Sequence, residues 1–199
     1  MSTSVVLKLN AQKLREYSPS ADELQQINRK PIYIIVENVL DTYNIGAIFR
    51  LADAVAASAV YLVGDTATPD DPLVGHKIHK SSVGTWRWMP WKYCKTVKEA
   101  IEQIQNSKFE VPNKSKTPNS KIRKLHLVAV EQHKESVPYT DFTFEFPVAF
   151  IVGHETTGVS KEALSLADAI VEIPMFGVNK SLNVMVSLAI VLWKGIEKL

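Results

Sequence analysis

The chain has 199 residues, of which 46% are hydrophobic and 22% are charged, and its formal net charge at pH 7 is +2. This length and composition exclude a disordered chain and a collagen-like fibre, and they predict a soluble protein with one domain. The single cysteine excludes an internal disulfide and a cysteine-based zinc site. The start of the chain lacks the apolar core of a signal peptide, and no run of about 18 apolar residues is present, so we expect a cytoplasmic protein without a membrane span.

The first thirty residues are polar and predict a short N-terminal extension, 1–30. Ser18-Pro19-Ser20 interrupts this segment, and a short helix is expected around Asp22–Arg29, capped by Ser20 or Asp22. Residues 31–199 are predicted to form the folded domain.

A strand, a helix and a second strand come next. The apolar, β-branched run IYIIVENV at 32–39 predicts a buried strand, and AVYLVG at 59–64 predicts another. Between them, IGAIFRLADAVAASA has helical periodicity, with Asn44 as the expected N-cap. A strand–helix–strand unit of this kind implies a parallel sheet with a right-handed crossover.

The rest of the chain continues the alternation of strands and helices. A polar connection at 65–90 is too long for a routine loop and indicates a functional segment, and the Pro/Ser/Asn/Lys-rich stretch at 108–124 indicates an insertion. The pattern predicts an α/β fold with a mostly parallel sheet of five or six strands flanked by helices. Further helices are expected at 96–105, 161–167 and 183–199, and further strands at 125–130, 147–153 and 169–174.

The first polar segment of interest, Asn44-Ile-Gly46-Ala-Ile-Phe-Arg50, follows the first strand. Ligands of α/β proteins commonly bind at this place, where a parallel strand ends and a helix begins. Gly46 allows a close approach of the backbone, and the Arg50 guanidinium is suited to a phosphate or a carboxylate. Alternatively, Asn44 only caps the helix and Arg50 only pairs on the surface.

The second segment, Gly153-His-Glu155-Thr-Thr-Gly158, leaves another buried strand. Its glycines allow backbone amides to approach a ligand, and Glu155 supplies an acceptor. The spacing is not the three-glycine dinucleotide fingerprint. His154 lacks partners at the spacing of metal ligands, so no metal site is predicted.

The third segment, IPMFGVNKSLNV, joins the last strand to the last helix. Ser181 as an ordinary N-cap and Asn183 as an early helix residue would explain part of it. That interpretation does not explain why Gly177, Ser181 and Asn183 are gathered between two apolar segments.

The three segments together resemble the SpoU/TrmH family of SPOUT methyltransferases. Its motifs are N-x-G-x-x-x-R after the first strand, a G-x-E-x-x-G turn and an I-P-M-x-G-x-x-x-S-L-N-V closing loop, and all three occur here in that order, across Ile32–Trp193. His154 departs from the family, which usually has Asn or Gln there, and it has no assigned role.

The resemblance implies a C-terminal deep trefoil knot, a homodimer and S-adenosylmethionine bound in the knot. The closing helix 183–199 would then be the dimer interface, and intrachain core is the less favoured alternative. The implied cofactor contacts, mostly through the backbone, are Val130, Glu131, Gly153, Ile173, Met175 and Leu182.

The implied reaction is methylation of an RNA ribose 2′-hydroxyl, with Arg50 beside that hydroxyl. An ordinary arginine is too basic to act as a base at pH 7, so we expect Arg50 to act by electrostatics and positioning. The remaining implied catalytic residues orient Arg50, the ribose and the loop; they are Asn44, Glu155, Ser181 and Asn183.

RNA is expected to bind at 76–93, where cations alternate with tryptophans that either stack on bases or belong to the core or the dimer contact. The family also has K-x-S-x-G stretches near the substrate, which favours Lys80, Ser82 and Gly84. Lys114–Lys124 either touches RNA or is a solvated loop. The predicted RNA-binding cations are Lys77, Lys80, Arg87 and Lys92.

Several alternatives remain open. A dehydrogenase or a phosphate-transfer enzyme would need glycine-rich fingerprints that are absent. A SPOUT-fold RNA-binding protein without catalysis would have lost the reactive positions, which are all present. The motifs favour tRNA as substrate, with a D-loop guanosine as the expected target, and ribosomal RNA is the other candidate.

Overall fold

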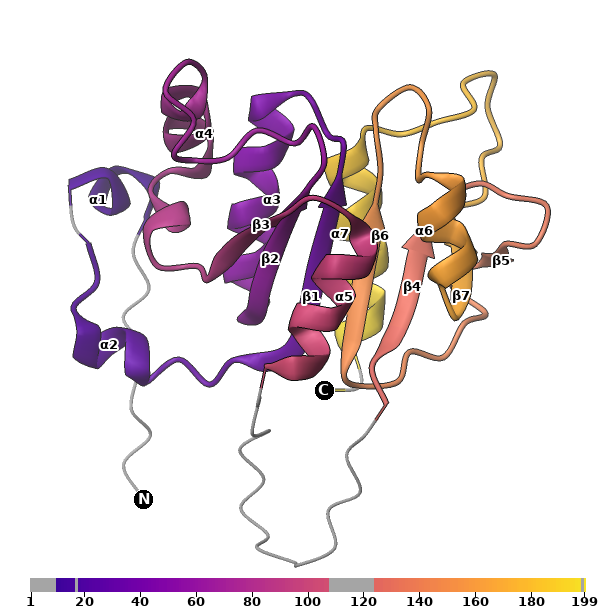
Figure 1. Ribbon diagram of the computed structural model, residues 1–199, viewed down its shortest axis with the longest axis horizontal. Coiled ribbons are helices and arrows are strands. Elements are labelled where there is room, and N and C mark those ends of the chain that lie inside the picture. Colours follow the sequence, from indigo (N-terminus) through magenta and orange to yellow (C-terminus); the bar gives the residue numbers. More distant parts are fainter. Residues whose placement is uncertain (1–9, 17, 108–123, 198) are drawn as a thin grey trace, which may run out of the picture.

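The computed structural model describes residues 10–16, 18–107, 124–197 and 199 (Figure 1). The predicted Lys114–Lys124 contact lies outside the described residues, apart from Lys124. None of the helices in the described part of the chain combines the length and the apolar character that a membrane span requires.

The structure is built on one sheet of seven strands in the order β3-β2-β1-β6-β4-β7-β5, and every pairing is parallel. The predicted α/β class and parallel sheet are therefore confirmed. Two strands were not predicted, β3 and β5, because both are short edge strands with few buried side chains. The strands are β1 Lys30–Glu37, β2 Ala57–Val63, β3 Trp91–Cys94, β4 His126–Val130, β5 Val137–Pro138, β6 Val148–Val152 and β7 Ala169–Glu172.

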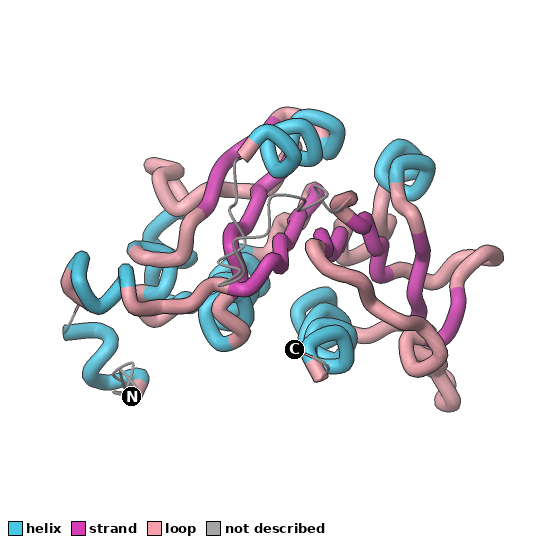
Figure 2. The backbone as a smooth tube through the Cα atoms, turned by 90° about the horizontal axis from the view of Figure 1, so that it is seen from below, coloured by secondary structure: helices cyan, strands magenta, loops and turns pink. Residues whose placement is uncertain are grey.

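Helices cover both faces of the sheet (Figure 2). Buried side chains of α3 and α7 form one core layer with the sheet, and those of α5 and α6 form the other. The helices are α1 Ala11–Glu16, α2 Ala21–Gln25, α3 Thr42–Ala54, α4 Gly75–Ser82, α5 Val97–Asn106, α6 Lys161–Leu166 and α7 Val184–Ile196, with a 3-10 turn η1 at Thr85–Arg87.

The central strand β1 shows why the sheet needs cover on both sides. Ile32, Ile34 and Val36 pack in the layer of α3 and α7, whereas Tyr33 and Ile35 pack in the layer of α5 and α6. Successive side chains of a strand point to opposite faces, so a strand covered on both sides must be apolar throughout. Each such side chain contributes roughly 1.5–3 kcal/mol when fully buried.

The starts of α2 and α3 test the predicted caps. Ser20 caps α2 in a capping box with Glu23, as the sequence predicts. Asn44, in contrast, does not cap α3: the helix begins at Thr42, and Asp41 caps it by accepting the amide of Tyr43 at 2.8 Å. Asn44 lies inside the first turn and is buried.

The predicted polar connection 65–90 contains the helix α4, which was not expected, and the turn η1. Gly46 in α3 explains how closely α4 packs. A Cβ at this position would overlap the Ser81 hydroxyl and would lie 2.7 Å from the backbone nitrogen of Ser82. The close approach predicted for Gly46 is therefore an approach between two helices, not to a ligand.

Candidate cofactor pocket and reaction site

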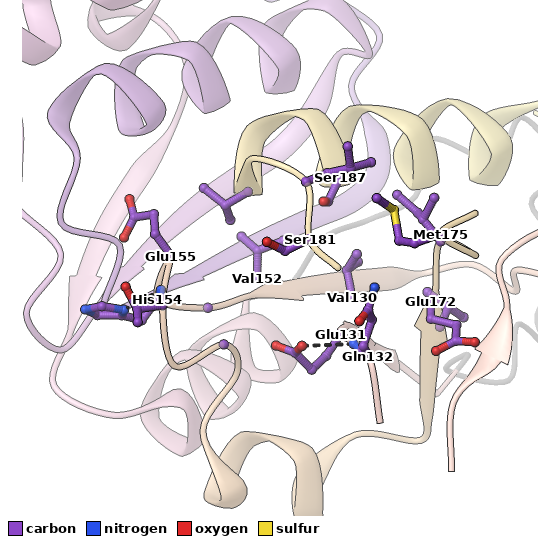
Figure 3. A pocket seen from close by; sticks show the side chains of 17 residues that line it. Val130, Glu131, Gln132, Val152, His154, Glu155, Glu172, Met175, Ser181 and Ser187 are labelled. Carbon is purple, nitrogen blue, oxygen red and sulfur yellow. Dashed lines mark hydrogen bonds between the residues drawn. The ribbon is translucent and has the colours of Figure 1, made fainter. Parts of the chain in front are cut away.

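A cavity of about 180 Å³ lies at the carboxyl edge of the sheet, beyond β4, β6 and β7 and beside the start of α7 (Figure 3). This is the edge at which α/β sheets bind ligands. Glu155 and Ser181 line it, so the second and third polar segments meet there. All six predicted cofactor contacts also line it: Val130, Glu131, Gly153, Ile173, Met175 and Leu182.

Three polar lining residues lie outside the three polar segments and were not predicted from the sequence: Gln132, Glu172 and Ser187. Gln132 directly follows the predicted contact Glu131, and Glu172 is the last residue of β7, so position at a strand end was a usable signal. Ser187 is the only polar residue in the first two turns of α7, which is otherwise apolar. A lone polar residue in an apolar helix start was the signal there.

A chain of hydrogen bonds joins the three polar segments. Asn44 Nδ2 donates to Glu155 Oε1 at 3.1 Å, and Asn183 Nδ2 donates to Asn44 Oδ1 at 3.0 Å. Asn183 Oδ1 in turn accepts two backbone amides of the first turn of α7, which makes Asn183 the N-cap of that helix. The alternative with Ser181 as the cap is therefore wrong.

Glu155 is the acceptor at the end of this chain. Its carboxylate also accepts the backbone amides of Leu40 at 3.2 Å and Asp41 at 3.1 Å, so it fastens the turn after β1. Burial alone would raise the pKa of Glu155, but the hydrogen bonds from Asn44 and from backbone amides outweigh it and lower the pKa. Glu155 is therefore ionised at neutral pH and serves as an acceptor.

The turn that carries Glu155 is closed by its own backbone and by His154. The backbones of His154 and Gly158 exchange hydrogen bonds at 3.1 and 2.9 Å, and a Cβ on Gly153 would overlap the Gly158 carbonyl. His154 Nδ1 accepts the amides of Thr156 and Thr157 at 2.9 and 3.3 Å. An Asn side-chain oxygen makes bonds of this kind in turns, so the imidazole nitrogen substitutes for an amide oxygen.

Two more carboxylates hold the end of the same turn. Glu131 Oε2 accepts the amide of Val159 at 2.8 Å, and Glu37 accepts the amide and the hydroxyl of Ser160 at 3.0 and 2.7 Å. Gly158 has a φ of +72°, and a Cβ there would overlap the Glu131 carboxylate. The turn is thus fixed from both sides before any ligand binds.

The side chains that line the cavity carry mainly negative charge. Among the described residues, its lining includes the carboxylates Glu131, Glu155 and Glu172 and includes no lysine or arginine. Glu172 is oriented by the Ser136 hydroxyl, which donates to it at 2.8 Å. In a partly enclosed site, carboxylates at several sides favour a cationic ligand over a neutral one of the same shape.

The model of the SpoU rRNA Methylase family matches residues 31–193. The chain belongs to this family. The family resemblance inferred from the three polar segments is thereby confirmed. Among curated relatives, the tRNA (guanosine(18)-2′-O)-methyltransferase of Thermus thermophilus is 27% identical over 87% of this chain and 78% of its own. The 23S rRNA (guanosine-2′-O-)-methyltransferase RlmB of Nitrosomonas europaea is 28% identical over 92% of this chain and 62% of its own.

Solved structures of family members are also similar. AviRb of Streptomyces viridochromogenes, in complex with AdoMet, has a TM-score of 0.69 and 26% identity, over 88% of this chain and 64% of its own. The AdoMet-bound rRNA methyltransferase of Sinorhizobium meliloti has a TM-score of 0.67 and 25% identity, over 92% of this chain and 59% of its own. The chain therefore spans about three-fifths of the length of these two structures.

Arg50, the reactive residue expected for this family, lies apart from the cavity within one chain. It is six residues after Asn44, which places it about 9 Å further along α3, away from the carboxyl edge. Its side chain is exposed, and it is not among the residues that line the cavity. Its contact with the reacting ribose stays a prediction.

The four predicted RNA-binding cations are all exposed and come from three neighbouring elements: Lys77 and Lys80 from α4, Arg87 from η1 and Lys92 from β3. Lys80 and Arg87 also line a second hollow between α4 and η1. Ser82 and Gly84 of the K-x-S-x-G stretch are buried, so they shape the backbone.

The tryptophans of this region pack into the protein. Trp88 is buried and donates to Asp53 at 2.8 Å, and Trp91 packs edge-on against Phe49. Trp86 is partly buried, with its ring stacked on His79 at 4.1 Å. The interpretation of at least two of these rings as core is confirmed, because Trp88 is buried and Trp91 is a partly buried ring packed against the core.

Proposed function

We propose that this protein is an S-adenosylmethionine-dependent RNA 2′-O-ribose methyltransferase. The observation that carries the proposal is the hydrogen-bond chain Glu155–Asn44–Asn183, which borders a cavity lined by all six expected cofactor contacts. Family membership and AdoMet-bound family structures support the same conclusion.

The residues present fit the cofactor. A sulfonium is a cation, and the cavity combines three carboxylates with apolar side chains of Val130, Ile173, Met175 and Leu182 that suit a purine. When bound, S-adenosylmethionine would supply an electrophilic methyl group for attack by the ribose oxygen. Gly153 lines the cavity, and its lack of a side chain allows the turn to close against the Gly158 backbone.

The chain's own residues position the reactants. Glu155 is ionised and occupied by three donors, so we assign it the role of a positioning residue that holds Asn44 and the turn after β1. Asn183 and Ser181 place the start of α7 at the cavity. Arg50, exposed on α3, binds the phosphate beside the target ribose and stabilises the developing alkoxide.

The protein acts as a homodimer through the outer face of α7. Val186, Ile190 and Trp193 follow one another at helical spacing along that face, and Val186 and Trp193 are exposed. Tyr43, at the start of the neighbouring α3, is also exposed. Light scattering is expected to give the mass of a dimer for the wild type and of a monomer for Trp193→Glu.

Transfer RNA is the favoured substrate, because several relatives are named as tRNA (guanosine(18)-2′-O)-methyltransferases. Ribosomal RNA is the second candidate, supported by the Nitrosomonas europaea relative. The knot in the closing segment, the division into 1–30 and 31–199 and the cytoplasmic location belong to this proposal.

Two measurements test the function. Calorimetric titration with S-adenosylmethionine is expected to show binding of the cofactor, and absence of binding would contradict the proposal. Incubation with methyl-labelled cofactor and either total tRNA or ribosomal RNA, followed by mapping of the labelled nucleotide, is expected to find a 2′-O-methylated ribose in tRNA. Label on a base would refute ribose methylation, and label only in ribosomal RNA would refute the tRNA assignment.

A further inference from the structure

The loop between β7 and α7 divides into two stems and a tip. Ile173 and Met175 on one stem and Ser181 and Leu182 on the other line the cavity, whereas the tip, Phe176–Lys180, does not. Figure 1 shows this loop, in yellow, projecting beyond the carboxyl edge of the sheet. The tip is therefore placed at the mouth of the cavity.

The tip presents apolar side chains to solvent. Phe176 is 97% exposed and Val178 is 102% exposed, and a Cβ on Gly177 would meet no atom within 4 Å. The base of the tip is nevertheless anchored, because Gln132 Nε2 donates to the Lys180 carbonyl at 2.6 Å. The Phe176 ring is therefore free to contact a partner, because it does not pack against the rest of the protein.

We propose that Phe176 stacks on a base of the RNA substrate next to the nucleotide whose ribose reaches the mouth of the cavity. This inference rests on the proposed function. A base offers a flat π-face of the kind that exposed aromatic side chains of RNA-binding proteins stack on. Trp88, which the sequence offered for stacking, is buried, and Trp91 is partly buried against the core. Phe176 is the most exposed aromatic side chain in the described part of the chain.

The charges around the tip favour RNA over a second copy of the chain. Lys180 is exposed at the end of the tip, where its ammonium can contact a phosphate. The cavity behind it is lined by carboxylates, which repel phosphate, so the backbone of the RNA must be held at the rim. The exposed apolar residues assigned to a second copy, Val186 and Trp193, belong to α7 and not to the tip.

The test compares Phe176→Ala and Phe176→Tyr with Val178→Ala, a matched control that removes an equally exposed apolar side chain without a ring. Unfractionated tRNA and ribosomal RNA serve as substrates in separate assays. We expect Phe176→Ala to raise the KM for RNA about fivefold to a hundredfold, which corresponds to the loss of one base stack. Phe176→Tyr and Val178→Ala are expected to stay close to the wild type.

Calorimetry with S-adenosylmethionine and light scattering complete the experiment. The inference predicts unchanged cofactor affinity and unchanged mass for Phe176→Ala. An unchanged KM for RNA, a fall in cofactor affinity or a change in mass would overturn it, the last two by assigning the ring to the cofactor or to a second copy. Wild-type methyl transfer with an unaffected Phe176→Ala variant would refute this inference alone, whereas a wild type that neither binds cofactor nor transfers methyl groups would refute the proposed function.

Discussion

Asn183 at the start of α7 donates to Asn44 in α3 at 3.0 Å, although the two residues are 139 positions apart in the chain. In each residue both the Nδ2 and the Oδ1 atom of the side chain form hydrogen bonds: Asn44 also donates to Glu155, and Asn183 also caps α7. Neither amide can rotate by half a turn without losing hydrogen bonds on both sides. The pair therefore fixes how the first and last motifs meet.

Asn183→Asp separates the two roles of this residue. An aspartate keeps an oxygen that caps α7 but removes the donor to Asn44, and Asp and Asn are about equally good caps. We expect a lower Tm, because a carboxylate oxygen then faces the buried Asn44 Oδ1 and leaves it without a donor. We also expect a fall of about tenfold in the kcat for methyl transfer, the effect of roughly 1.4 kcal/mol. Asn183→Ala also removes the cap, so its stability is expected to fall by about 1–2 kcal/mol in urea denaturation. Full activity of Asn183→Asp would show that the donor to Asn44 is dispensable.

Glu155 makes stability depend on pH. Burial, which raises its pKa, is outweighed by hydrogen bonds from Asn44 and backbone amides, so its pKa lies below the ordinary 4.5. A group with a lowered pKa stabilises the folded state above its unfolded pKa, and this contribution is lost as the pH falls through the folded pKa. The stability difference between the wild type and Glu155→Gln is therefore expected to be largest above pH 4.5 and to shrink in more acidic solution. The exposed Glu102→Gln is the control, and a difference independent of pH for Glu155→Gln would contradict the argument.

The carboxylates of the cavity predict discrimination between cofactor and product. S-adenosylmethionine carries a sulfonium charge that S-adenosylhomocysteine lacks, and each carboxylate a few ångströms away is worth about 1 kcal/mol to a cation in a polar environment. We expect Glu131→Gln and Glu172→Gln each to lower the ratio of the two affinities about threefold to tenfold, measured by calorimetry. Glu102→Gln, on α5, should leave the ratio unchanged. Equal losses of affinity for both ligands would indicate a structural role for Glu131, which also holds Val159.

Gly46 predicts a steric effect of a single methyl group. Gly46→Ala places a Cβ against Ser81 and the backbone of Ser82, so α4 must move away from α3. We expect a loss of about 1–3 kcal/mol in the free energy of unfolding and weaker RNA binding, because Lys77 and Lys80 move with α4. Gly177→Ala, where the added Cβ meets open space, is the matched control for stability. Similar unfolding curves for both variants would contradict the packing argument.

Arg50 is expected to act through its guanidinium fork. Arg50→Lys keeps the charge but loses the bidentate geometry, so we expect a clear fall in kcat for methyl transfer with RNA binding largely retained. Arg50→Ala, which also removes the charge, should lower RNA binding as well. Binding is measured by filter retention at fixed salt. Near-normal methyl transfer by Arg50→Lys would refute the positioning role.

The sequence predicts the parts of the site that depend on strand ends. The residues after β4, β6 and β7 meet at one edge because parallel strands bring their carboxyl ends together, and Val130, Gly153 and Ile173 indeed border one cavity. The hydrogen bond between Asn44 and Asn183 could not be predicted from the sequence, because it depends on how two helices meet in space. The edge strand β3 was also missed, because a short strand with only Cys94 fully buried has no clear apolar pattern.

The order of strands in the sheet also has a consequence for synthesis of the chain. β1 pairs with β2 on one side, but its other neighbour, β6, follows roughly 110 residues later. At a translation rate of about 5–20 residues per second, one edge of β1 remains without its partner for about 6–20 seconds. During this interval an apolar strand edge is open on the nascent chain, and edges of this kind readily pair with other chains. We therefore expect chaperones that shield nascent strands to raise the yield of folded protein, most of all at high expression levels.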